Sequence, residues 1–210
     1  MHHEDCSSWE YGGHPARADV TSRCANFLVQ LRTKTEEFKS YPADTRQAHS
    51  YIFENVAPVA CPEIIGNYRG SEIPCLKNYP VYVPMDRRVG TQPNLVKRQM
   101  SDLATHLNRA IQVFDKAWAA RKVPDDDAVF LVKLVQIAAH FLQRFLTVHP
   151  YANGNGHMGR MIVWVLLGRF GYWPVKWPLD ESPPYYQALT DHRDGNTKPL
   201  TDFILLCIRG

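Results

Sequence analysis

The residues best suited to chemistry form one run of twelve, residues 149–160, which reads HPYANGNGHMGR. His149 is a base whose ordinary pKa lies near neutral, so it can accept a proton. Gly154 and Gly156 allow backbone angles that are closed to other residues. Their N–H groups, near the start of a helix, can face an anion. Arg160 can bind a phosphate with its planar guanidinium, so the run combines a base with an anion site.

Apolar runs on both sides predict how this segment is positioned. Residues 131–148 are almost wholly apolar and predict a buried helix, and residues 161–167 predict another. A loop between two buried helices is held in a fixed position. The alternative is that the loop only joins the helices, because Asn-Gly pairs are common in turns. The spacing alone leaves both interpretations open.

The run resembles the active loop of the Fic family, H-P-F-x-[D/E]-G-N-G-R-x-x-R. The matching positions are His149, Pro150, Gly154, Asn155, Gly156 and Arg160. Tyr151 replaces the usual phenylalanine. Two positions depart from the pattern, since Asn153 stands at the acidic position and His157 at the first arginine.

The resemblance implies a role for each matched position. The family usually transfers AMP from ATP to a protein, and His149 would take the proton of the Ser, Thr or Tyr hydroxyl that is modified. The backbone of residues 154–156 would bind the α- and β-phosphates. Asn155 would hold the loop and touch a phosphate oxygen, and Arg160 would pair with the terminal phosphate. Such transfer depends mainly on positioning and on neutralisation of charge.

The two departures fall where charge matters most. Asn153 is the expected ligand of Mg²⁺ or Mn²⁺, but its neutral oxygen attracts a cation less than a carboxylate does. His157 remains a predicted nucleotide-binding residue without the permanent charge of arginine. An adenylyltransferase is therefore expected. Transfer of another phosphate-containing group, removal of AMP, or binding of a nucleotide or partner without turnover stays open.

A second resemblance lies upstream, in residues 44–56, where a helix is predicted. The run from Ser50 to Asn55, SYIFEN, matches the family's inhibitory pattern [S/T]-x-x-x-E-[G/N]. Ser50 and Glu54 are four residues apart and therefore share a helix face. The resemblance implies that Glu54 pairs with Arg160 in the place of the γ-phosphate. Alternatively, Glu54 positions water for removal of AMP, or it is a solvated surface residue.

Residues 64–84 resemble the flap, a pair of strands that holds the target protein in this family. Short strands are predicted at residues 64–69 and 81–83, in a segment too rich in proline and glycine for long helices. The target would add a strand to the edge of the flap. The residues predicted to bind it are Tyr68, Arg69 and Tyr82. Packing of the tyrosines in the core is the alternative.

The pattern as a whole predicts an all-α fold, a Fic-like helical bundle with one small β-hairpin. Residues 1–42 are expected to form an N-terminal extension, and residues 43–210 the Fic-like domain. Helices are predicted at residues 20–38, 44–54, 93–121, 131–148, 157–170, 182–191 and 200–208.

Composition bounds the class of protein. The 210 residues carry a net charge of only +3, which predicts no nucleic-acid or membrane partner. No run is read as long enough to span a membrane, and the N-terminus lacks the apolar stretch of a signal peptide. Five cysteines without a Cys-x-x-Cys pair predict reduced thiols in the cytoplasm. The expected partners are a nucleotide and a target protein, and a homo-oligomer is left open.

Overall fold

The computed structural model describes residues 9–34, 41–81, 83, 86–121, 125–175 and 186–209. This part of the chain is helical and contains no strand, which confirms the all-α prediction. The helices are α1 (Arg17–Thr33), α2 (Arg46–Phe53), α3 (Pro74–Lys77), α4 (Pro93–Ala120), α5 (Asp125–Val148), α6 (Asn155–Gly168), α7 (Tyr186–Arg193) and α8 (Lys198–Arg209). Short 3-10 turns lie at Glu54–Val56 and Pro62–Ile64.

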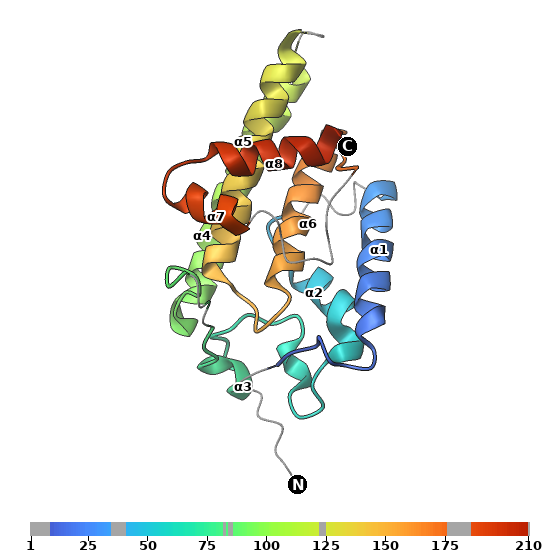
Figure 1. Ribbon diagram of the computed structural model, residues 1–210, viewed down its shortest axis with the longest axis vertical. Helices are drawn as coiled ribbons and strands as arrows, with labels where there is room; N and C mark the ends of the chain where they lie inside the picture. The colour runs from blue at the N-terminus through green and yellow to red at the C-terminus, as the bar shows by residue number, and fades with distance from the viewer. Residues whose placement is uncertain are drawn as a thin grey trace.

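Helix α5 is the central helix, and α4, α6, α7 and α8 pack on it (Figure 1). Its inward residues have no exposed surface: Leu134, Val135, Ala138, Ala139, Leu142 and Phe145. The predicted start at residue 131 is six residues late, because the polar first turn from Asp125 also belongs to the helix. The predicted end at Val148 is correct. His149 is therefore the first residue after the buried central helix.

The stretch Asp127–Val148 corrects one expectation about membranes. These 22 residues are long and apolar enough to cross a membrane by length and composition. Half of the stretch is buried inside the protein, among the helices that surround α5. A central helix of a helical bundle passes the same test, so the stretch is explained by its place in the core.

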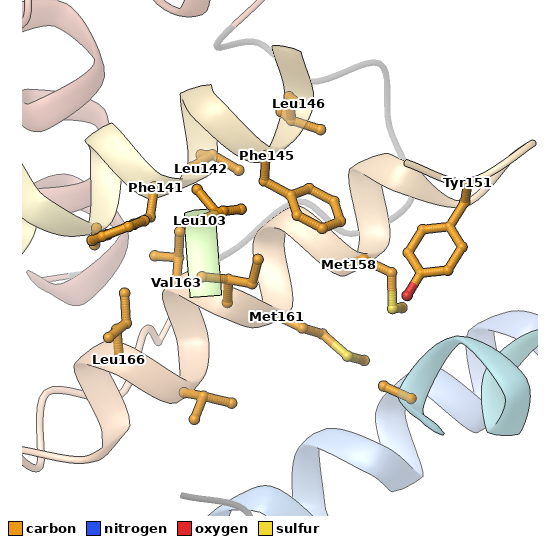
Figure 2. Close-up of a cluster of buried hydrophobic side chains, with 14 of the residues drawn as sticks. Leu103, Phe141, Leu142, Phe145, Leu146, Tyr151, Met158, Met161, Val163 and Leu166 are labelled. Carbon is orange, nitrogen blue, oxygen red and sulfur yellow. The ribbon is translucent and has the colours of Figure 1, made fainter. Parts of the chain in front are cut away.

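Helix α6 packs closely on α5 because of a glycine at their contact. A Cβ atom at Gly159 would lie 2.9 Å from a methyl carbon of Leu142 and 3.3 Å from one of Leu146. Figure 2 shows this part of the core, where Met158 of α6 and Tyr151 of the preceding loop point toward each other. Both side chains are fully buried. The segment between the two helices is thus anchored in the core.

The predicted β-hairpin is wrong for the described residues of the flap segment. The backbone N–H groups that a strand partner would need are bonded elsewhere. The N–H of Arg69 donates to the carbonyl of Pro150 (2.8 Å), and that of Gly70 to Leu76 (2.8 Å). Gly66 and Gly70 both have φ +76°, which turns the chain instead of extending it. The segment is an irregular connection that contains the one-turn helix α3. It contacts the loop after α5 through the hydrogen bond between Arg69 and Pro150.

The expectation of reduced thiols is also wrong in part. Cys61 is disulfide-bonded, whereas Cys24, Cys75 and Cys207 are thiols. The argument from cysteines for a reducing compartment therefore no longer holds.

Candidate active site

The site begins where α5 ends, at a residue with strained backbone angles. His149 is the only described non-glycine residue with positive φ, at 52°. Its N–H donates to the carbonyl of Phe145 (2.9 Å), so the last helical bond is kept while the chain turns away. Pro150 follows and disfavours a right-handed helical conformation at the residue before it. A left-handed residue costs about 1 kcal/mol, which the surrounding contacts must offset.

Arg69 provides the contacts that offset this cost. Its guanidinium donates to the carbonyls of Val148 (3.1 Å) and His149 (2.8 Å), at the C-terminal end of α5. It also donates to the carbonyls of Tyr79 and Thr91, each at 3.0 Å. A cation at this end satisfies carbonyls that have no helical partner and interacts favourably with the helix dipole. Arg69 therefore fixes the position of His149.

The predicted role of Arg69 in binding a target is wrong for its side chain, which is only 1% exposed. Tyr68 is partly buried, and its ring packs on that of Tyr151 with 5.1 Å between centroids. The packing alternative therefore describes Tyr68 better than a surface role does. Tyr82 lies outside the described residues.

The imidazole of His149 is a neutral base with a defined tautomer. Its Nδ1 lies 3.2 Å from the carbonyl oxygen of Leu146. A carbonyl can only accept, so Nδ1 carries the proton and Nε2 has a free lone pair. The pKa of His149 is lowered to about 4, mainly by burial and in smaller part by the charge of Arg69, while the hydrogen bond to Leu146 opposes the change. The base is therefore unprotonated at neutral pH.

The middle of the loop is held by the side chain of Asn155. Its Oδ1 accepts from the N–H of Tyr151 (2.8 Å), and its Nδ2 donates to the carbonyl of the same residue (2.9 Å). Asn155 is 2% exposed and spends both polar atoms on the loop. The predicted role in holding the loop agrees with these bonds, but a direct contact of this side chain with phosphate does not.

Gly154 caps the helix that follows the loop. It has φ 78° and ψ 2°, the left-handed conformation that glycine adopts without strain. Helix α6 starts at Asn155, and its first i to i−4 bond runs from the N–H of Met158 to Gly154 (3.1 Å). Backbone N–H groups in this first turn have no partner within the helix, so they are suited to binding an anion. Gly156 lies in that turn, because the helix begins two residues before its predicted start at residue 157.

Arg160 and His157 supply different amounts of charge to this turn. Arg160 is 4% exposed, and its guanidinium lies against Gly156, where a Cβ atom would be 3.2 Å from Nη1. Burial, together with the charges of Arg160 and His49, lowers the pKa of His157 to about 3. Arg160 is therefore a permanent cation at the loop, whereas His157 is neutral and gives no substitute for the family's arginine.

The side chain of Asn153 is oriented so that its oxygen, the atom that could bind a metal, is bonded within the loop, while its N–H₂ group points away from the loop. Its Oδ1 accepts from the N–H of Gly154 (2.7 Å), and its Nδ2 donates to the carbonyl of Trp9 (3.1 Å) and the carboxylate of Glu10 (3.0 Å). Rotating the amide by 180° would place its oxygen against the oxygens of Trp9 and Glu10, and its N–H₂ group against the N–H of Gly154. The orientation is thus fixed, and the prediction that Asn153 binds a cation does not fit this arrangement.

Helix α2 covers the loop through two residues that the sequence analysis missed. Nε2 of His49 lies 3.0 Å from the carbonyl of Asn153, and Nδ1 accepts from the N–H of Gly66 (3.0 Å). Phe53 lies one turn later, and a Cβ atom at Gly154 would be 2.5 Å from its ring. In the sequence, the (i, i+4) spacing of these two aromatic residues could have indicated that they share one face of the helix.

The prediction that Glu54 pairs with Arg160 is wrong in this structure. The Glu54 carboxylate accepts from Arg23 of α1 at 3.0 Å, and its side chain is 70% exposed. Ser50 and Glu54 do share a face, as predicted, and both line a shallow pocket of about 470 Å³. No residue of the active loop lines that pocket. The face of α2 that meets the loop is the one with His49 and Phe53.

A comparison with known protein families agrees with the geometry of the loop. The model of the Fic/DOC family matches residues 40–167, which is more than half of the chain and includes the whole loop. The chain belongs to the Fic/DOC family.

Several animal proteins named protein adenylyltransferase Fic are similar to this Fic/DOC domain. The Drosophila persimilis protein is 34% identical over 73 residues, which cover 35% of this chain and 14% of the relative. The Culex quinquefasciatus protein is 33% identical over 78 residues, covering 37% and 16%. Caenorhabditis elegans protein adenylyltransferase fic-1 is 23% identical over 141 residues, covering 67% and 24%. The matched regions thus span at most a quarter of these relatives.

We expect Glu54→Ala to leave the affinity of the Fic/DOC domain for ATP unchanged. Its carboxylate pairs with Arg23 at the surface, so the variant should lose only about 0–1 kcal/mol of the free energy of unfolding. Calorimetric titration with ATP and urea unfolding measure the two quantities. An increase in ATP affinity would mean that Glu54 reaches Arg160 in another conformation, contrary to the arrangement seen here.

Three neutral histidines, of which His49 is buried and His149 and His157 are partly buried, should make the Fic/DOC domain sensitive to acid. Burial lowers the pKa of His49 and His149 to about 4 and that of His157 to about 3. The unfolded chain, with histidine pKa values near 6.5, binds protons that the folded chain does not. The free energy of unfolding should therefore fall as the pH falls from about 6.5 toward 4. The expected loss at pH 5 is on the order of 2 kcal/mol per histidine.

Urea unfolding at pH 7 and pH 5 measures this loss. His157→Phe removes one of the titrating groups and should flatten the dependence, whereas His106→Asn, at an exposed position, should not. Equal stability at the two pH values would show that the three imidazoles are already charged, or free to become so, in the folded protein.

Proposed function

We propose that this Fic/DOC domain transfers AMP from ATP to a hydroxyl group of a target protein. The observation that carries the proposal is the distance of 3.2 Å between Nδ1 of His149 and the carbonyl oxygen of Leu146, which assigns the proton to Nδ1 and leaves Nε2 as a free base. This base stands at the start of a loop that ends in the N-terminus of α6, with Arg160 beside Gly156. A base and an anion site in one rigid loop suit phosphoryl-type transfer.

In the proposed step, the target hydroxyl attacks ATP while His149 acts as the general base. The target hydroxyl loses its proton to Nε2 of His149 as its oxygen attacks the α-phosphorus of ATP. A new oxygen–phosphorus bond forms, and the bond between the α-phosphorus and the oxygen that bridges to the β-phosphate breaks. Pyrophosphate leaves with the electron pair of that bond. The N–H groups at the start of α6 and the guanidinium of Arg160 stabilise the phosphate charge.

No step is assigned to a metal ion. Oδ1 of Asn153 is bonded to the N–H of Gly154, so the residue at the family's metal position offers an amide N–H₂ group toward the mouth. No cluster of three His, Cys, Asp or Glu side chains that could hold an ion occurs among the described residues. In this proposal, phosphate charge would be balanced by Arg160 and the start of α6.

A second function is favoured by the same two departures from the family pattern. With an amide donor at Asn153 and a neutral imidazole at His157, the loop carries less positive charge than the pattern provides. Such a domain would bind a nucleotide without transferring AMP. The two functions differ in whether bound ATP is turned over.

The deciding experiment combines binding and mass measurement. Calorimetry with ATP, in the presence of Mg²⁺ or Mn²⁺, measures binding. Intact-mass analysis of the chain after incubation with each nucleoside triphosphate detects self-modification, and ATP labelled at its α-phosphate detects transfer to proteins of an extract. Binding together with transfer of AMP supports the adenylyltransferase. Binding without transfer or release of pyrophosphate supports the second function, and absence of binding contradicts both.

A further inference from the structure

Three residues before α1 lie directly on the active loop. We call Trp9, Glu10 and Tyr11 the strap. The carbonyl of Trp9 and the carboxylate of Glu10 both accept hydrogen bonds from Nδ2 of Asn153, at 3.1 and 3.0 Å. In Figure 1 the strap belongs to the blue segment that passes the loop between α5 and α6. These two hydrogen bonds therefore join Asn153 of the loop to residues that are 144 and 143 positions away in the sequence.

The strap is anchored at a definite position. The backbone N–H of Trp9 donates to the hydroxyl of Tyr79 (3.0 Å), and its indole Nε1 donates to the carbonyl of Val56 (3.1 Å). The side chain is only 7% exposed, and its ring lies 6.0 Å from that of Phe53. Tyr79 also offers its carbonyl to Arg69. The anchor of the strap and the residue that fixes His149 therefore meet at Tyr79.

Tyr11 extends the strap to the first turn of α6. Its ring centroid lies 5.2 Å from that of Phe53 and 6.3 Å from that of His157. The pKa of its hydroxyl is raised, mainly by burial, while the nearby positive charge of Arg160 opposes the rise. The phenol thus shares the surroundings of the residues that are suited to bind phosphate.

We propose that the strap is a built-in competitor of the nucleotide, which must leave the loop before phosphates can bind there. The proposal rests on the proposed binding of ATP at this loop. Two anions placed side by side at the loop repel each other, and the carboxylate of Glu10 is already bonded to Asn153 there. Tyr11 adds bulk over the start of α6, and Trp9 holds both residues in place. Inhibition therefore resides in the strap, on the side of the loop that Glu54 does not reach.

Variants in the full chain test the competition through the affinity for ATP in the presence of Mg²⁺. Glu10 is exposed, so Glu10→Ala should fold normally while it removes the carboxylate from the loop. ATP should then bind about three- to tenfold more tightly, because the folded state without ATP loses a contact that competes with it. Glu10→Gln keeps the shape and should give a smaller gain. Glu72→Ala removes an exposed carboxylate paired with Lys77 and should change nothing.

A second variant loosens the anchor without touching the loop. Tyr79→Phe removes only the hydroxyl that accepts from the N–H of Trp9. It should also tighten ATP binding, by about two- to fivefold, because the strap is released more easily. Hydrogen exchange of the wild-type chain should show faster exchange in residues 9–13 when ATP is added.

Each contrary result has a definite meaning. Weaker ATP binding by Glu10→Ala would overturn the proposal and make Glu10 a group that helps to hold the nucleotide. Unchanged affinity in Glu10→Ala and Tyr79→Phe, with residues 9–13 still protected when ATP is bound, would overturn the strap alone and leave the proposed function standing. Absence of ATP binding in the wild type and in both variants would overturn both proposals.

Discussion

Replacing His149 by alanine should lower AMP transfer by about 10²- to 10⁴-fold, which is the usual contribution of a general base. The lone pair on Nε2 is available because Nδ1–H is bonded to Leu146, whereas both nitrogens of His49, which lies against the loop, are engaged. His49 has one nitrogen on Asn153 and the other on Gly66. The rate of transfer of α-labelled phosphate from ATP, at saturating ATP, measures the loss.

His149→Asn is the matched control for the backbone at this position. Because φ is 52°, alanine is strained there, whereas asparagine tolerates the left-handed region. Both variants should lose transfer and keep ATP binding, and His149→Asn should keep more of the free energy of unfolding. If either variant transferred AMP at the wild-type rate, His149 would not be the base.

Replacing Arg69 by methionine should cause a large loss of stability, about 3–5 kcal/mol. Its guanidinium, 1% exposed, donates to four backbone carbonyls that come from three separate segments. Methionine fills much of the volume but leaves these acceptors without a donor, and unsatisfied buried groups are costly. Burial lowers the pKa of Arg69 to about 10, so the group is still charged at neutral pH. Urea unfolding at pH 7 measures the effect.

Arg46→Met is the matched control for this prediction. Arg46 pairs with Asp44 at the surface, where its side chain is 54% exposed, so its loss should cost only about 0–1 kcal/mol. Arg69→Lys keeps a charge but cannot reach four carbonyls at once, and its stability should lie between those of the wild type and Arg69→Met. Equal stability of Arg69→Met and Arg46→Met would mean that Arg69 does not hold the loop.

The local sequence determined the positions of the main helices and of the loop between two of them. Continuous apolar residues before and after residues 149–160 made both neighbouring helices predictable, because burial of such runs is the main force in folding. Gly154 stands in the left-handed conformation that its type suggests, and Gly156 lies in the first turn of α6. The family, too, was evident from the loop, since its residue types and spacing lie within one short segment.

The tertiary structure alone decided what surrounds that loop. Arg69 read as a surface residue of a hairpin, but it is buried against carbonyls from residues 79, 91 and 148–149. Helix α2 was predicted, yet the face that it turns to the loop is set by His49 and Phe53, and Glu54 is drawn to Arg23 on α1. The strap reaches Asn153 across more than 140 positions of sequence. Each of these is a hydrogen bond or ring contact between distant segments, and the periodicity of neighbouring residues carries no information about such pairs.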